Sequence, residues 1–163
     1  TRFFISILCA LLEHYVDVRL IGDEHAGHEI IFKLKQWDDA ICKMDVQNII
    51  RLCQSDVSLF DIGFELQGVQ AYQELWRRYA PFFQGEIKVF RRNINIFSRD
   101  GLAFLHCYSK LDHASGVATP EIPWCRTTLC FQKTVGEWLV AHQHISVPVD
   151  FETKMSKPIY FPD

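Results

Sequence analysis

The spacing of the apolar residues changes at Pro81, and this change constrains the fold more than any other feature of the sequence. Before Pro81, apolar residues recur at steps of three and four, at Ile30, Leu34, Trp37, Ile41 and Met44. This spacing is typical of a helix with one buried face. After Pro81, apolar and polar residues alternate, as in strands with one buried face. Helices followed by strands predict an α+β fold.

Three helices are expected in the first half of the chain. The apolar stripe predicts a long helix over residues 28–44. Asp45 is placed to cap a short second helix, because a carboxylate can accept hydrogen bonds from the free amides of the first turn. A third helix is predicted over Val69–Tyr79, ending before Pro81.

Five strands are expected, together with an irregular tail over residues 150–163. A short strand is predicted over 57–60, and long strands over 86–97, 102–111, 122–133 and 137–147. Turn-forming residues separate the long strands, at 98–101, 112–116 and 134–136. We therefore expect an antiparallel meander that packs on the helices.

Composition excludes several classes of protein. The 163 residues are 48% hydrophobic and 13% aromatic, which predicts one folded domain rather than a disordered chain. The 17 Lys and Arg residues are scattered among 20 Asp and Glu residues, so neither nucleic acid nor a membrane surface is an expected partner. The six cysteines form no C-x-x-C pair, which favours reduced thiols in a cytoplasmic protein over disulfides.

Residues 3–12 form an apolar run near the start of the chain. A membrane-spanning helix needs about 20 apolar residues, so this run is too short to cross a bilayer. A secretory signal is disfavoured, because Arg2 is the only charge before the run and no small-residue cleavage site follows. We expect residues 1–27 to be an extra helix or strand packed onto a domain over 28–163, with a processed or truncated start as the alternative.

Several motifs together resemble a known family. They are Trp37-Asp-Asp-Ala-Ile-Cys-Lys-Met-Asp45, Ser55-Asp-Val-Ser-Leu-Phe-Asp61, Gly68, Trp124-Cys-Arg-Thr-Thr128 and Gly136-x-Trp-x-Val-x-His-x-His-x-Ser146. In these residues the chain resembles the SnoaL-like and ketosteroid isomerase-like branch of the nuclear transport factor 2-like superfamily. The resemblance runs over about 28–148. It implies a cone, in which a curved antiparallel sheet closes over about three N-terminal helices in a cystatin-like α+β roll.

The resemblance also implies a candidate base. The family's isomerases move a proton between carbons with an aspartate in a dry pocket, without a cofactor. Asp61 matches the position of that aspartate, and apolar residues surround it in the sequence. The alternative is a turn carboxylate that caps backbone amides at residues 61–63.

Two departures from the isomerase pattern argue against classical steroid isomerisation. Trp37 stands where the isomerases carry the phenolic donor of the oxyanion hole, and an indole N–H is a weaker acid than a phenol. The family's second donor, an acid, falls near Thr128. Neither strong donor is therefore present at the matching positions.

The end motif is also similar to the last strand of the calcium/calmodulin-dependent kinase association domain, a non-catalytic relative. Pocket arginines of that domain match Tyr108, Leu129 and Ile145 here, so the resemblance implies a more apolar pocket. The residues expected to line it are Trp37, Phe60, Tyr72, Trp76, Tyr108, Arg126, Thr128, Gln143 and Ile145.

The last predicted strand carries two histidines whose direction decides their role. Strict alternation places Trp138, Val140, His142, His144 and Ser146 on one face and Leu139, Ala141, Gln143 and Ile145 on the other. The positions of the relatives favour the Gln143 face as pocket. That leaves His142, His144 and Ser146 on an outer face where such cones dimerise, unless a β-bulge reverses the faces.

Two further interpretations of polar residues stay open. A metal site at His142 and His144 is less favoured than structural hydrogen bonding, because no clear third ligand follows in the sequence. Arg126 is suited either to orienting a substrate carboxylate or to pairing with a carboxylate across a dimer interface.

The sequence therefore predicts a SnoaL-like homodimer with an apolar pocket for a small apolar or carbonyl-bearing molecule. Cofactor-free proton transfer by Asp61, of isomerase or cyclase type, is the expected activity, with no metal and no cofactor. The alternative is a non-catalytic ligand-binding protein or an oligomerisation module.

Overall fold

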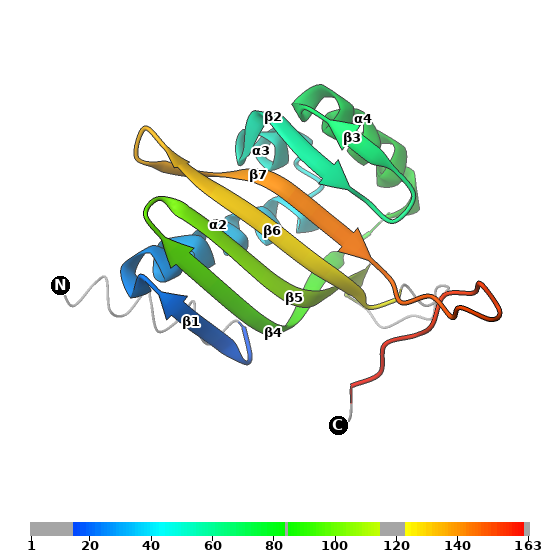
Figure 1. Cartoon of the computed structure of the whole chain (residues 1–163). Helices are drawn as coiled ribbons and strands as arrows, with labels where there is room; N and C mark the ends of the chain where they lie inside the picture. The colour runs from blue at the N-terminus through cyan, green and yellow to red at the C-terminus, as the bar shows by residue number, and fades with distance from the viewer. Residues whose placement is uncertain (1–14, 84, 115–122, 162–163) are drawn as a thin grey trace.

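The computed structural model describes residues 15–83, 85–114 and 123–161, and within them a curved sheet packs on helices (Figure 1). The elements are β1 Val18–Gly22, α2 Glu24–Cys42, α3 Val46–Arg51, β2 Cys53–Phe60, β3 Glu65–Gln67, α4 Val69–Tyr79, a 3₁₀ turn η1 Ala80–Phe82, β4 Ile87–Arg99, β5 Leu102–His113, β6 Cys125–Thr134 and β7 Glu137–Ser146. Helices and strands follow the order expected from the sequence, and the α+β fold class is confirmed.

The strands of the described residues form one mixed sheet in the order β1-β4-β5-β6-β7-β2-β3. The predicted meander is correct for β4 to β7, which pair antiparallel. The sheet continues beyond this meander at both sides, where β1 runs parallel to β4 and β2 runs parallel to β7. Strands β1 and β3 occupy opposite edges of the sheet (Figure 1). The apolar run 3–12 lies outside the described residues, and β1 is the strand found in the rest of the 1–27 segment.

Side-chain caps set the helix starts. Helix α2 begins four residues earlier than the apolar stripe indicates, because Asp23 accepts a hydrogen bond from the Ala26 amide at 3.1 Å. Asp45 caps α3 through the Asn48 amide at 3.1 Å, as expected. Helix α4 has the predicted bounds.

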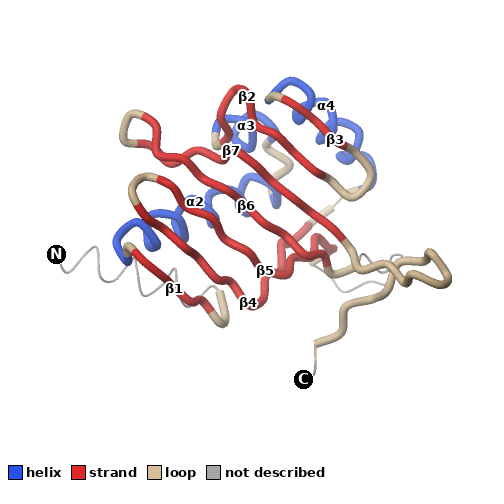
Figure 2. The backbone as a smooth tube through the Cα atoms, in the orientation of Figure 1, coloured by secondary structure: helices blue, strands red, loops and turns tan. Residues whose placement is uncertain are grey.

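The core lies between the helices and the concave face of the sheet. Figure 2 shows the helices gathered on one side of the strands. The stripe of α2 is almost fully buried, with Ile30 and Leu34 at 0% exposure and Trp37 at 2%. It packs with inward strand residues such as Ile96 and Leu105, which are also 0% exposed. No helix of the described segments is long and apolar enough to cross a membrane.

A bulge in β7 changes which side chains face the core. Trp138 and Val140 are buried on the concave side, yet Gln143 is buried on that side as well. The register against β6 shifts between these positions, leaving Ala141 as the extra residue. Strict alternation along the strand is therefore wrong. Trp138 and Val140 share the face of Gln143 and not that of His142.

A buried ion pair joins α2 to β4. The Arg91 Nε donates to Asp38 Oδ2 at 2.8 Å, and its Nη2 donates to Asp38 Oδ1 at 2.6 Å. Both side chains are nearly inaccessible, at 3% exposure for Arg91 and 4% for Asp38. The Tyr15 hydroxyl also donates to Asp38, at 2.8 Å. Two buried charges are tolerated because each satisfies the other in a bidentate geometry.

This pair predicts a large difference between neighbouring aspartates of α2. Asp38→Asn leaves the Arg91 cation buried without its counter-charge, which should lower the free energy of unfolding by about 3–5 kcal/mol. Asp39→Asn removes the exposed pair with Lys35 at 2.9 Å and should cost less than about 1 kcal/mol. Urea unfolding of the two variants measures the difference, and equal losses would contradict the assigned burial of the pair.

Candidate functional site

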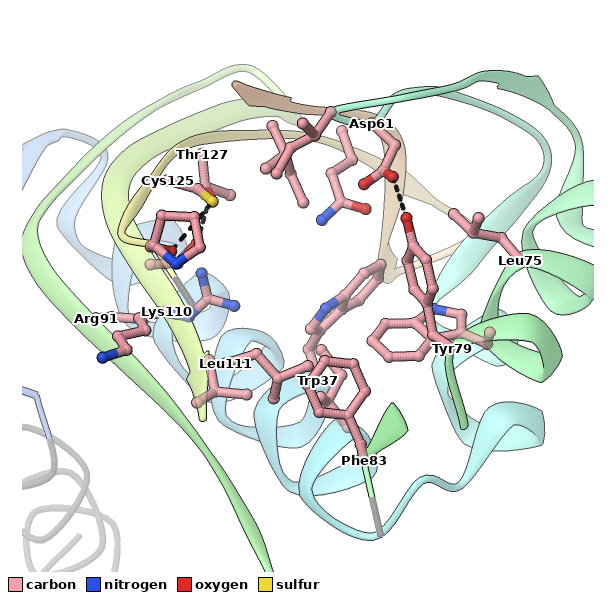
Figure 3. A pocket seen from close by; sticks show the side chains of 18 of the residues that line it. Trp37, Asp61, Leu75, Tyr79, Phe83, Arg91, Lys110, Leu111, Cys125 and Thr127 are labelled. Carbon is pink, nitrogen blue, oxygen red and sulfur yellow. Dashed lines mark hydrogen bonds between the residues drawn. The ribbon is translucent and has the colours of Figure 1, made fainter. Parts of the chain in front are cut away.

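A cavity of about 370 Å³ opens between the concave face of the sheet, α2, α4 and η1 (Figure 3). It is lined by Trp37, Ile41, Asp61, Ile62, Tyr72, Leu75, Trp76, Tyr79, Phe82, Phe83, Val89, Arg91, Ser109, Lys110, Leu111, Pro123, Cys125, Thr127, Gln143 and Ile145. Aromatic and aliphatic side chains dominate this wall. Such a cavity suits a small, mostly apolar molecule held by a few polar groups.

Helix α4 supplies one aromatic side of the cavity. Tyr72, Leu75, Trp76 and Tyr79 recur at steps of three, one and three, so they share the face that α4 turns to the sheet. The Tyr72 hydroxyl reaches across to β7 and donates to Gln143 Oε1 at 2.8 Å. Burial raises the pKa of Tyr72 well above its usual range, so this hydroxyl stays protonated.

Asp61 lies immediately after β2, at the wall of the cavity. Its Oδ2 accepts a hydrogen bond from the Tyr79 hydroxyl at 2.5 Å, which Figure 3 shows as a dashed line. The backbone amide of Asp61 donates to the Phe64 carbonyl at 2.8 Å, whereas its side chain caps no backbone amide of the described chain. The alternative of a turn-capping carboxylate therefore does not describe this residue.

The second oxygen of Asp61 is available. Among the described residues, no hydrogen bond reaches Asp61 Oδ1, while Oδ2 is held by Tyr79. Burial, together with the hydrogen bond and the charge of Asp61, raises the pKa of Tyr79 above its usual range. Tyr79 is thus a fixed donor that orients the carboxylate and leaves one oxygen facing the cavity region.

Burial affects two further polar groups in the wall, the Trp37 indole N–H and the Cys125 thiol. The Trp37 Nε1 is buried and has no hydrogen-bond partner in the described part of the chain. A buried N–H without an acceptor costs free energy, so a ligand oxygen would be a favourable partner. Burial raises the pKa of the Cys125 thiol to about 11, so Cys125 is a neutral side chain and not a nucleophile near pH 7.

The structure adds Arg91 to the wall, a residue that sequence reasoning missed. A bulge between Arg92 and Asn95 breaks the alternation of β4, so the facing of the Arg91-Arg92 pair cannot be counted from the end of the strand. One signal was available. Asp38 lies four residues after Leu34 and three before Ile41, within the apolar stripe, and a carboxylate there needs a buried partner.

Six of the residues predicted for the site line the cavity, and four predicted for the pocket do not. Those around the cavity are Trp37, Asp61, Tyr72, Trp76, Gln143 and Ile145. Those outside it are Phe60, Tyr108, Arg126 and Thr128. The strand register explains the correction on β6. Arg126 is paired with Ser146 and Thr128 with His144, and directly opposed residues share one face of a sheet.

The outer face of the sheet holds these displaced residues together with the two histidines. His142 Nδ1 lies 2.7 Å from Ser58 Oγ, and the His142 and His144 rings contact Phe60 edge-on. Arg126 Nε donates to Ser146 Oγ at 3.2 Å, so Arg126 points away from the cavity.

Tyr108 packs at the other end of this face. Its ring lies 5.0 Å from that of Phe161, in the C-terminal segment. Tyr108 is opposed to Arg126 across β5 and β6, which places both side chains on the outer face. Tyr108 therefore lies outside the cavity, and the polar side chains of its wall include Arg91 and Thr127.

The described segments contain neither a candidate metal site nor a disulfide bond. Groups of three or more His, Cys, Asp or Glu side chains able to hold a metal ion do not occur within residues 15–83, 85–114 and 123–161. The cysteines of these segments are free thiols: Cys42, Cys53, Cys107, Cys125 and Cys130. Cys9 lies outside the described residues.

Solved structures share this fold. An NTF2-like protein of unknown function from Pseudomonas putida matches with a TM-score of 0.74 and 23% identity, covering 82% of this chain and 94% of that chain. A putative scytalone dehydratase from Novosphingobium aromaticivorans matches with a TM-score of 0.65 and 16% identity over 83% and 93%. A putative ketosteroid isomerase from Shewanella frigidimarina matches with a TM-score of 0.62 and 16% identity over 78% and 99%.

The sequence itself identifies the family. No curated protein matches the chain. The model of the SnoaL-like domain matches residues 33–150, which is most of the chain and contains every helix and strand from α3 to β7. The cone-shaped fold of the described residues agrees with that match. The chain belongs to the SnoaL-like domain family.

Proposed function

We propose that the protein binds a small, largely apolar carbonyl compound in the cavity and transfers a proton with Asp61 as the base. The reaction is of the isomerase, cyclase or lyase type and uses no cofactor. One observation carries the proposal. Asp61 is a carboxylate in an aromatic wall, with Oδ2 fixed by Tyr79 and with Oδ1 free of partners in the described chain.

The chemistry follows from this arrangement. Asp61 Oδ1 takes a proton from the carbon next to the carbonyl group, and the electron pair of the broken C–H bond forms an enolate. The protonated Asp61 then returns the proton to another carbon, or, in a lyase-type reaction, the enolate expels a leaving group that takes the proton from Asp61. Tyr79 stays a neutral donor to Oδ2 throughout, because its pKa lies above its usual range.

Relatives of the same fold support this reaction class. The similar structures include one described as a putative scytalone dehydratase and one described as a putative ketosteroid isomerase. Removal of a proton next to a carbonyl group can begin both elimination and isomerisation. At 16% identity these structures share the fold alone, so the class rests on the geometry of Asp61.

A non-catalytic ligand-binding protein is the second candidate. The unpartnered Trp37 Nε1 favours it, because a buried donor in an apolar cavity is satisfied by binding alone, without turnover. Free thiols in the described segments also support a cytoplasmic location for either function.

Hydrogen–deuterium exchange separates the two functions. In D₂O the protein should speed exchange of the protons next to the carbonyl of 2-tetralone, a bicyclic ketone, followed by NMR. Asp61→Asn should reduce that rate by about 10²–10⁴-fold, because an amide cannot accept the proton. Asp56→Asn, which changes an exposed aspartate of β2, should leave the rate unchanged.

Unchanged exchange in the Asp61→Asn variant would overturn the assignment of the base. If the protein binds the ketone without speeding exchange, the non-catalytic function is favoured. Binding is measured as an increase in unfolding temperature that saturates with ligand concentration.

We also propose that two copies of the chain pair through the outer face of the sheet. Large apolar side chains remain exposed there, with Phe60 at 46%, Phe104 at 43% and Leu102 at 60%. Phe104 stacks on Phe97 at 4.6 Å between ring centroids, which makes a flat aromatic surface. Large exposed apolar side chains on one face are typical of an interface, and pairing through this face leaves the cavity on the opposite face.

Sedimentation tests the pairing. The unaltered protein should sediment as a dimer, and Phe104→Glu should weaken the dimer at least about tenfold, because it would bury an unpaired charge. Val135→Glu is the matched control, since Val135 is 99% exposed in the turn between β6 and β7. A monomer at high concentration contradicts the proposal. An assembly larger than a dimer would favour the alternative of an oligomerisation module.

A further inference from the structure

The buried guanidinium of Arg91 has N–H bonds that donate to none of the described residues. Its side chain is 3% exposed and lines the cavity. Nε and Nη2 donate to Asp38, and Nη1 donates to the Cys107 sulfur at 3.5 Å. A guanidinium carries five N–H bonds, so two of them have no partner among the described residues. A ligand in the cavity is the remaining source of acceptors.

Asp38 fixes the direction of this donor. The two parallel hydrogen bonds from Arg91 prevent the guanidinium from rotating, and Tyr15 holds the Asp38 carboxylate from a third side. Asp38 therefore acts as a positioning residue. A donor that is already oriented needs no reorganisation when charge develops on the ligand.

The charge balance of the Asp38–Arg91 pair favours a ligand oxygen that is neutral on binding and becomes negative during the reaction. Burial alone would lower the pKa of Arg91, but the Asp38 charge outweighs it and holds the pKa well above its usual range, so the cation persists. Asp38 cancels the net charge of the pair, which weakens attraction for a ligand that arrives as an anion. The free N–H bonds still strengthen their contact as a neutral oxygen becomes negative.

Arg91 lies across the cavity from the candidate base Asp61 (Figure 3). Figure 3 shows its guanidinium and the Asp61–Tyr79 pair on opposite sides of the cavity. Trp37, whose Nε1 is unpartnered, precedes Asp38 on α2 and lies in the same wall. A planar ligand spanning the cavity can therefore present an oxygen to Arg91 and a carbon to Asp61.

We propose that Arg91 binds the carbonyl oxygen of the ligand and stabilises the enolate that Asp61 generates, with Trp37 as a second donor. This inference rests on the proposed function and narrows its substrates to neutral, enolisable carbonyl compounds. It also revises the expectation drawn from Trp37 and Thr128, because a strong donor is present at a position the motifs did not indicate.

Bound 2-naphthol tests the proposal. Its naphtholate resembles an enolate in shape and charge, and its fluorescence and absorbance report the ionised fraction. The test uses Asp61→Asn, which mimics the protonated base and removes a repelling charge. In this variant, bound naphthol should ionise more readily than free naphthol, with an acidity constant at least about tenfold larger.

Two further variants locate the cause. Adding Asp38→Asn and Arg91→Met to Asp61→Asn should abolish the increase in acidity. Adding Arg99→Met should preserve it, because Arg99 is an exposed arginine of the same strand β4 that does not line the cavity. Equal acidity of bound naphthol with and without Arg91 would overturn the proposal, and so would loss of the effect with Arg99→Met.

A second measurement applies if the triple variant that lacks Asp61, Asp38 and Arg91 does not fold. Replacing both charges avoids leaving one of them buried alone, and thermal unfolding shows whether the triple variant is folded. If it is not, the Arg91 Nε–H resonance is followed by NMR in the Asp61→Asn protein during naphthol addition. The Arg91 resonance should shift as the ionised fraction of bound naphthol increases, and an unchanged resonance would contradict the proposal. Ketone exchange tests Asp61 separately, so either assignment can fail alone.

Discussion

The Asp38–Arg91 ion pair is the interaction on which the rest of the structure depends. It ties the main helix α2 to the long strand β4 inside the cone, where neither charge reaches solvent. An apolar pair would hold the same two elements at no desolvation cost. A role for the guanidinium in ligand binding, as proposed, would account for this desolvation cost. The same contact that positions α2 also presents fixed N–H bonds to the cavity.

The two faces of the sheet carry polar side chains in different surroundings. On the concave face, Asp61 and Arg91 lie in a cavity lined mainly by aromatic and aliphatic side chains. On the outer face, His142 and Ser58 satisfy each other beside exposed Phe60. Polar groups on this second face need no cavity chemistry to explain them, because a self-contained hydrogen bond already accounts for their presence.

Features governed by local signals could be predicted from the sequence, and those governed by register could not. The Asp45 cap and the ends of α4 follow from the residues themselves. Strand β1 is short and gains stability from pairing with the distant β4, and β3 is a three-residue strand that pairs with the preceding β2, so their own residues carry little signal. Alternation along β6 places Arg126 and Thr128 on the face opposite to buried Thr127, so the positions carried over from the family, and not the strand pattern, misplaced these two residues. Asp61 and Trp37 were found through the family motifs, whereas Arg91 was hidden by the bulge in β4.

The extra residue at Ala141 has a consequence for the composition of the cavity wall. If Ala141 paired with β6 and did not bulge, every later residue of β7 would shift by one position, which would turn the two imidazoles into the cavity and Gln143 out of it. The bulge therefore decides which polar side chains of β7 reach the cavity beside Asp61 and Arg91, while every other strand keeps its place.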